Sequence, residues 1–232
     1  MIVSHATEIG SRDGNEDAYL VMPEFGLFAV CDGMGGHKSG EVASALAVRA
    51  MDETFQAMVD QPLRDVMCTA IARANKDILL KGRSKAHRGM GTTVVALAFG
   101  TLDTVALGWA GDSRCYRLRG SRLEQLTDDH SIINRLLSAG QITPQEVATH
   151  PDRGVIYRCL GLTTSESGDV RLIDVDPGDV YLLCSDGLTD AMSDEVIGIV
   201  LSRGGDAQAL VDTAIAMGLE GQDNVTAVVV RP

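Results

Sequence analysis

The sequence predicts a single α+β domain in which two antiparallel β-sheets pack together and pairs of helices lie outside them. Apolar segments of strand length follow one another without intervening helices, and the helical segments come in pairs. There is no regular βαβ alternation and no repeat of solenoid period. At 232 residues the chain can bury a substantial core, and we assign residues 1–232 to one domain.

The N-terminal part is predicted to contain three short strands and then two long helices. The run Gly26 to Cys31 is continuously apolar, as expected of a strand that is buried on both faces. The second helical stretch repeats its apolar residues on one face, from Val66 to Ile78. The predicted strands are 2–7, 19–22 and 26–31, and the predicted helices are 40–60 and 62–81.

The middle of the chain is predicted to be rich in strands and to end in a small insert. Arg119-Gly120-Ser121 reads as the turn of a hairpin. Segment 127–168 has the weakest strand content, with a helix at 130–139. A capping box at Thr143 to Glu146 predicts a further short helix that reaches about residue 149. The predicted strands are 92–98, 103–109, 115–118 and 122–126.

The C-terminal part is predicted to add three strands and a second helical pair. Asp176-Pro177-Gly178-Asp179 is a strong turn signal between two strands. A continuous apolar run then closes the chain. The predicted strands are 170–175, 179–184 and 225–230, and the predicted helices are 193–202 and 206–218.

Composition and charge exclude several classes of function. The chain has 20 Lys and Arg against 32 Asp and Glu, and a net charge of −12 argues against nucleic acid as the main partner. No run approaches the about 18 apolar residues of a membrane span, and the first ten residues form no apolar signal segment. The five cysteines show no CxxC spacing, which suits a reducing compartment. We therefore expect a cytoplasmic protein. We also expect a monomer, although the composition does not determine the oligomeric state.

Four aspartates stand where predicted buried strands end or begin: Asp32, Asp112, Asp186 and Asp223. A carboxylate beside a buried strand costs several kcal/mol if it has no partner, and a cluster of carboxylates needs a positive charge among them. Carboxylates without His or Cys companions are the ligands of a hard cation such as Mg²⁺ or Mn²⁺. Each Asp taken alone also fits an ordinary turn, and the coincidence of several favours the metal.

The glycine-rich stretch 32–40 does not fit a nucleotide-binding loop. His37 stands where a phosphate-binding loop needs Gly before Lys-Ser, and the G-x-G-x-x-G spacing is missing. Gly33 has a backbone carbonyl that a metal can approach closely. The sequence also lacks a G-x-S-x-G elbow, an H-E-x-x-H pair and a Cys/His zinc cluster, which excludes the common serine and zinc hydrolases.

Six short motifs resemble, in order and spacing, those of the PPM (PP2C-type) protein serine/threonine phosphatases. The resemblance spans about residues 4 to 230 and is closest to the bacterial branch, with Asp129-His-Ser131, His150-Pro151 and Leu160-Gly161 as the insert pattern. The six motifs are Arg12-Asp-Gly-Asn-Glu-Asp17, Asp32-Gly-Met-Gly-Gly-His37, Gly91-Thr-Thr93, Gly111-Asp-Ser-Arg114, Ser185-Asp-Gly-Leu-Thr-Asp190 and Asp223-Asn-Val-Thr226.

The resemblance implies the family's four-layer α-β-β-α sandwich, with two Mg²⁺ or Mn²⁺ ions at one end and the insert 127–168 as a mobile flap. It further implies a third, weaker ion between Asp112 and Asp186, and ordering of the metal waters by Glu16. The positions that match the core metal ligands are Asp17 (directly or through water), Asp32, Gly33 through its carbonyl, Asp186 and Asp223.

The implied chemistry is direct attack of a metal-bridging hydroxide on phosphorus, without a phosphoenzyme. Arg12 matches the family's phosphate-binding arginine, and its planar fork suits two phosphate oxygens. His37 is the candidate acid for the leaving alkoxide. Many eukaryotic relatives have His where Met34 stands, so the acid is His37, a metal-bound water or neither, and His37 equally fits a role in shaping its loop.

We therefore expect a metal-dependent phosphatase for phosphoserine and phosphothreonine, acting on proteins that a bacterial serine/threonine kinase phosphorylates. The alternatives are a regulatory or binding module of the same fold with little turnover, and a hydrolase of small phosphate esters. Loss of metal aspartates would favour the module, and none is missing. One basic cluster, Lys81 to Arg88, fits either a solvated loop or a contact with acidic phosphoprotein segments.

Overall fold

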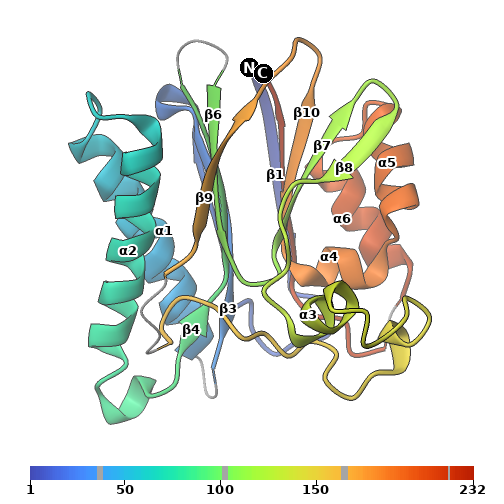
Figure 1. The fold of residues 1–232 in the computed structure, drawn as a ribbon, viewed down its shortest axis with the longest axis horizontal. Coiled ribbons are helices and arrows are strands. Elements are labelled where there is room, and N and C mark those ends of the chain that lie inside the picture. Colours follow the sequence, from blue (N-terminus) through green and yellow to red (C-terminus); the bar gives the residue numbers. More distant parts are fainter. Residues whose placement is uncertain (36–38, 101–103, 163–166, 219) are drawn as a thin grey trace.

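Two antiparallel β-sheets face each other at the centre of the computed structural model, which describes residues 1–35, 39–100, 104–162, 167–218 and 220–232 (Figure 1). The first sheet has the order β1-β11-β10-β7-β8. The second has the order β2-β3-β5-β6-β9, with β4 paired to β3. The strands of the first sheet are β1 (Ile2–Glu8), β7 (Arg114–Arg119), β8 (Arg122–Gln125), β10 (Val180–Cys184) and β11 (Val225–Arg231). Those of the second are β2 (Asp17–Met22), β3 (Leu27–Met34), β4 (Gly91–Thr92), β5 (Val94–Phe99), β6 (Thr104–Ala110) and β9 (Asp169–Asp174).

Helices cover the outer face of each sheet, so that the molecule has four layers (Figure 1). The long helices α1 (Ser39–Ala57) and α2 (Leu63–Lys81) pack on the second sheet. Three shorter helices pack on the first sheet: α4 (Asp186–Ala191), α5 (Asp194–Ser202) and α6 (Ala207–Ala216). The predicted α+β sandwich with helices outside is therefore confirmed.

The continuously apolar strands are explained by burial on both faces. Alternate side chains of a strand point to opposite faces of its sheet. In β3, Phe28 and Val30 enter the core between the sheets, while Ala29 and Cys31 pack under α1 and α2. In β11, the run of valines divides in the same way between the inner core and the helical side. Full burial of each such large apolar side chain is worth about 1.5–3 kcal/mol.

Most predicted elements lie within a few residues of the observed ones, but three local predictions were wrong. The strand predicted at 92–98 is broken into β4 and β5 at Thr93. Helix α4 was not predicted, because six residues are too few to show a helical period. The capping box forms no α-helix: the Glu146 carboxylate accepts hydrogen bonds from Thr143 N and Oγ1, but the chain makes a turn followed by a 3₁₀ helix, η3 (Val147–Thr149).

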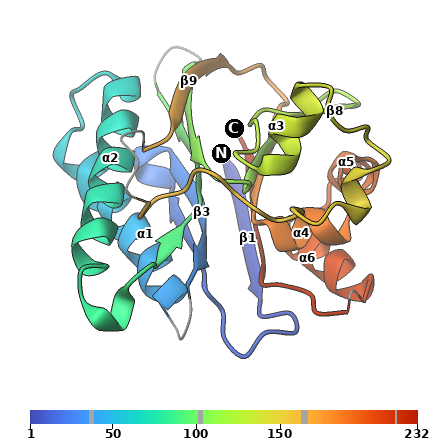
Figure 2. The same ribbon diagram turned by 60° about the horizontal axis from the view of Figure 1, so that its bottom comes forward.

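The described part of segment 127–168 lies across one end of the sandwich, and Figure 2 turns this end forward. It contains α3 (Ile132–Ser138), capped by the Ser131 hydroxyl, and η3. Bridges Ser131↔Ile156 and Thr92↔Leu160 hold it to itself and to β4. Among the described helices, none has both the length and the apolar character that crossing a membrane requires.

Candidate metal centre

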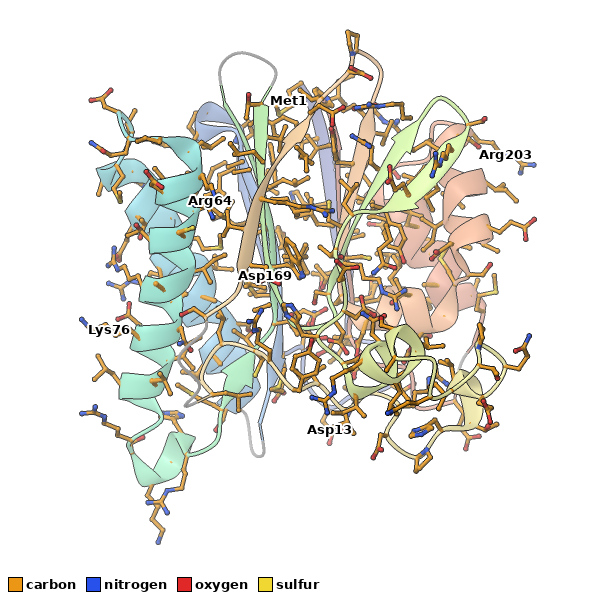
Figure 3. All side chains as sticks on the ribbon, viewed as in Figure 1. Met1, Asp13, Arg64, Lys76, Asp169 and Arg203 are labelled. Carbon is orange, nitrogen blue, oxygen red and sulfur yellow. The ribbon has the colours of Figure 1, made fainter. Side chains whose placement is uncertain are left out.

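Four of the predicted metal-binding aspartates, and Gly33 as the fifth predicted ligand, line one cavity of about 710 Å³ at the end of the sandwich that the insert covers. Asp32 lies near the end of β3, Asp112 in the turn between β6 and β7, Asp186 at the start of α4, and Asp223 just before β11. Arg12, Glu16 and Gly33 line the same cavity, as does Asp13, which is labelled at this end in Figure 3. The two sheets thus contribute acidic side chains to one space.

Asp17 lies behind this group rather than on the cavity wall. It stands directly opposite Asp32 in the β2–β3 register. The Ser185 hydroxyl donates a hydrogen bond of 2.8 Å to Asp17 Oδ2 and accepts one of 3.0 Å from Thr226 N. Asp17 on the second sheet is therefore held by residues of the first sheet, next to Asp186.

The acidic side chains raise one another's pKa. Burial, followed by neighbouring carboxylates, raises the pKa of Asp17 to about 7 and the pKa of Asp186 to about 6, and it raises the pKa of Asp32 well above its usual 3.8. Burial and the charge of Asp186 also raise the pKa of Asp112 to about 7. Without a cation these groups retain their protons to a higher pH than exposed aspartates do, and a divalent ion would replace those protons.

One carboxylate oxygen of Asp186 has the environment expected of a ligand to a hard cation. Asp186 Oδ1 is buried and has no hydrogen-bond partner among the described residues, which is uncommon for a buried polar atom. No three His, Cys, Asp or Glu side chains in the described ranges are already arranged as a metal cage. Mg²⁺ usually takes only one or two carboxylates and keeps several waters, so this donor set suits a hydrated ion.

Gly33 is placed where no other residue fits. A Cβ atom there would lie 2.5 Å from the Glu16 carbonyl oxygen and would also collide with Gly40 O. The Gly33 amide donates to that same Glu16 carbonyl at 3.2 Å. The requirement for Gly is therefore steric, and it brings the β3 backbone directly to the cavity wall.

Several hydroxyl and amide groups around the aspartates were not assigned a role from the sequence. Thr93 Oγ1 accepts a hydrogen bond from Asp32 N at 2.9 Å and lies 2.6 Å from Ser113 Oγ, beside Asp112. The Asn224 side chain accepts from Glu16 N at 2.7 Å and donates to Gly14 O at 3.0 Å. All of these residues belong to the six motifs, which was the available signal, but their contacts are between distant segments.

Arg12 makes an ion pair at the cavity, with Asp223. Its Nη2 lies 2.5 Å from Asp223 Oδ2, and 56% of the Arg12 side chain is exposed. If Arg12 had no role in binding, the sequence would favour a surface ion pair with the nearby Glu16 or Asp17, but the observed partner is Asp223. His37, the candidate acid, lies outside the described residues. From the insert, Gly154 and Ile156 line the cavity.

Residues 6–210 match the sequence model of the family described as Protein phosphatase 2C. The chain belongs to the protein phosphatase 2C family. It is 35% identical over 212 residues to the serine/threonine phosphatase stp of Listeria monocytogenes, with 88% of this chain and 84% of stp covered. It is also 32% identical over 240 residues to the protein phosphatase PhpP of Streptococcus pneumoniae, with 99% and 97% covered.

Solved structures agree with this assignment. The Streptococcus agalactiae serine/threonine phosphatase superposes with a TM-score of 0.90 at 33% identity, covering 100% of this chain and 99% of that one. The catalytic domain of the phosphatase PstP, solved with two manganese ions, gives a TM-score of 0.85 at 34% identity, covering 98% and 96%. The predictions of the family, its fold and a metal-dependent serine/threonine protein phosphatase are confirmed.

Proposed function

We propose that this protein phosphatase binds two Mg²⁺ or Mn²⁺ ions through Asp32, Asp186, Asp223, the Gly33 carbonyl and Asp17, the last directly or through water. The observation that carries the proposal is Asp186 Oδ1, which is buried without a hydrogen-bond partner in the described ranges and stands in a cavity lined by carboxylates of raised pKa. When bound, the ions supply a hydroxide near neutral pH for in-line attack on the phosphorus atom.

Glu16 and Asp112 have supporting roles in this proposal. Burial and the charge of Asp223 raise the pKa of Glu16, while the charge of Arg12 lowers it. Glu16 therefore interacts electrostatically both with a proposed metal ligand and with the phosphate-binding arginine. Glu16 therefore suits the ordering of water molecules around the ions. Asp112 is close enough to Asp186 for that charge to raise its pKa, which supports a third, weaker ion between these two residues.

Arg12 binds the substrate phosphate. Its guanidinium is exposed at the cavity mouth and contacts Asp223 through one nitrogen, so the other face of the fork is open to phosphate oxygens. The leaving alkoxide needs a proton, for which His37 is the candidate donor within the sequence. In this proposal the insert 127–168 acts as a flap of a single catalytic domain, since Gly154 and Ile156 form part of the cavity wall.

We further propose a cytoplasmic, monomeric enzyme whose substrates are phosphoproteins made by a serine/threonine kinase. The test is hydrolysis of a phosphothreonine peptide by the wild type and by Asp186→Ala, with Mn²⁺, with Mg²⁺ and with chelator. Chelation should abolish turnover and Mn²⁺ should restore it in the wild type, while a folded Asp186→Ala variant stays inactive. Undiminished turnover in chelator would refute the metal mechanism.

A further inference from the structure

The connection between α2 and β4 carries a concentrated positive charge in an otherwise acidic protein. Residues 78–102 contain no Asp or Glu, although the chain has 32 of them. The basic side chains fall within eight positions, at the end of α2 and around the 3₁₀ helix η2 (Lys85–His87). We call this the basic loop, and its basic residues are Lys81, Arg83, Lys85, His87 and Arg88.

The charges of the basic loop have no neutralising partner within the part of the chain that the structure describes. The four Lys and Arg side chains are exposed, and within the described residues none makes an ion pair or a side-chain hydrogen bond. Several arginines elsewhere are paired: Arg73 with Glu53, Arg114 with Asp129 and Arg153 with Asp190. The basic loop therefore presents free positive charge to an external ligand, and a negative charge would be attracted to it.

The basic loop is fixed beside the cavity by backbone contacts. It leads directly into β4, where Gly91 pairs with Met34 and Thr92 with Gly33. Met34 and Gly33 line the cavity. A Cβ atom on Gly35, also a lining residue, would lie 3.3 Å from Met90 Cα. Ser39 at the start of α1 donates a hydrogen bond of 3.2 Å to Ala86 O. Figure 1 shows this connection at the same end of the sandwich as the end of β3.

We propose that the basic loop binds acidic residues that flank the phosphorylated residue of a protein substrate, and so makes the enzyme selective for phosphosites in acidic segments. This deepens the proposed function and rests on it. The phosphate occupies the cavity, and the substrate chain leaves it over the wall formed by Met34 and Gly35. Beyond that wall, among the residues that the structure describes, the exposed cation nearest to Met90 in the chain is Arg88, two residues away.

The length of chain needed to reach the basic loop follows from backbone dimensions. Two extended residues between Met90 and Arg88 span at most about 7 Å, and contact across the wall adds about 4 Å. An extended peptide advances about 3.3 Å per residue. Acidic side chains about three to five residues from the phosphorylated residue therefore reach Lys85 and Arg88. The orientation of the peptide decides whether those residues precede or follow the phosphosite.

The test uses phosphothreonine peptides that differ only in three Glu placed N-terminal, three Glu placed C-terminal, or Ala at both. The wild-type enzyme with Mn²⁺ should favour one acidic peptide in kcat/KM, on the order of threefold to tenfold, mainly through KM. The preference should shrink as ionic strength rises. In Lys85→Glu/Arg88→Glu it should disappear, and Arg88→Glu alone should reduce it.

Arg203→Glu is the matched control. Arg203 is exposed, makes no ion pair among the described residues, and lies far from the basic loop in Figure 3. It should retain the full preference, and all variants should hydrolyse p-nitrophenyl phosphate like the wild type. Absence of an acidic preference in the wild type, or its survival in the double variant, would overturn the proposal. Failure of the wild type on every substrate would instead refute the proposed function itself.

Discussion

In the absence of metal, the Asp186→Asn variant should be more stable than the wild type. In the presence of metal, the variant should be less stable than the wild type. The pKa of Asp186 is raised to about 6 by burial and then by Asp223 and Asp190. Its charged form is therefore disfavoured in the fold when no cation is present. Asn keeps the shape of the side chain and removes the charge, so the substitution relieves that cost and also removes a proposed metal ligand.

The size of the effect follows from the pKa. Because the folded value lies above the unfolded one, the cost of the charge begins above about pH 4 and is complete above about pH 6. A rise from 3.8 to about 6 corresponds to roughly 3 kcal/mol, which partial contact with solvent reduces to about 1–2 kcal/mol. In a chain of this length, that is a rise of about 2–8 °C in the unfolding midpoint.

Thermal unfolding near pH 7.5, in chelator and in excess Mn²⁺, measures both halves of the prediction. In chelator, Asp186→Asn should unfold at a higher temperature than the wild type, and the difference should narrow near pH 5. With Mn²⁺ at about 100 times its Kd, the wild type gains about 2.7 kcal/mol and the order inverts. Asp60→Asn, on an exposed aspartate away from the cavity, should show neither effect. A lower midpoint for Asp186→Asn in chelator would refute the reasoning and make Asp186 a turn residue.

Three further predictions concern the residues around the metal centre. Arg12→Ala should lower kcat/KM on a phosphopeptide by about tenfold to a hundredfold. Arg12→Lys should restore kcat/KM only in part, because an ammonium group lacks the planar fork of the guanidinium. An unchanged kcat/KM in Arg12→Ala would remove Arg12 from the site. Ser185→Ala should weaken Mn²⁺ binding about tenfold, because Asp17 loses the 2.8 Å hydrogen bond that the Ser185 hydroxyl donates to it. Calorimetry measures the Kd for Mn²⁺, and an unchanged Kd would show that this hydrogen bond does not position Asp17. His37→Ala should lower kcat on phosphopeptides but leave kcat nearly unchanged on phosphate esters with good leaving groups. Steady-state kinetics on both kinds of substrate measures this difference. Equal losses of kcat on both would exclude His37 as the acid.

The fold could be predicted where the sequence pattern reflects burial. The runs that became β3 and β11 are apolar throughout because both faces of each sheet are covered, one by helices and one by the other sheet. The prediction of secondary structure failed where one local sequence pattern is compatible with two backbone conformations, as at the capping box. Glu146 does reach back to Thr143, but Glu146 N donates to the Thr143 carbonyl instead of its hydroxyl, and this closes a turn.

The sequence indicated which acidic residues come together in one cavity, but not the contacts that they make there. Asp32, Asp186 and Asp223 were identified by their places at strand ends, and the structure brings them to one cavity. The pairing of Arg12 with Asp223 joins residues 211 apart in the chain, and no local pattern indicates it. The bond between Ser185 and Asp17 likewise spans 168 residues and depends on how the two sheets are stacked.

The placement of the acidic residues on two different sheets explains why the site needs the whole sandwich. Asp17 and Asp32 are neighbours in the second sheet, whereas Asp186 and Asp223 adjoin strands of the first. Their separation is set by the core between the sheets, in which Phe28, Val30 and Val228 are fully buried. Because such a core is close-packed, it resists changes in that separation. The ends of both sheets are tied directly as well, by Thr7 to Thr226 within the first sheet and by Ser185 to Asp17 across the two. The carboxylates are thus held together against their mutual repulsion by packing and hydrogen bonds, and this arrangement favours a cation between the sheets.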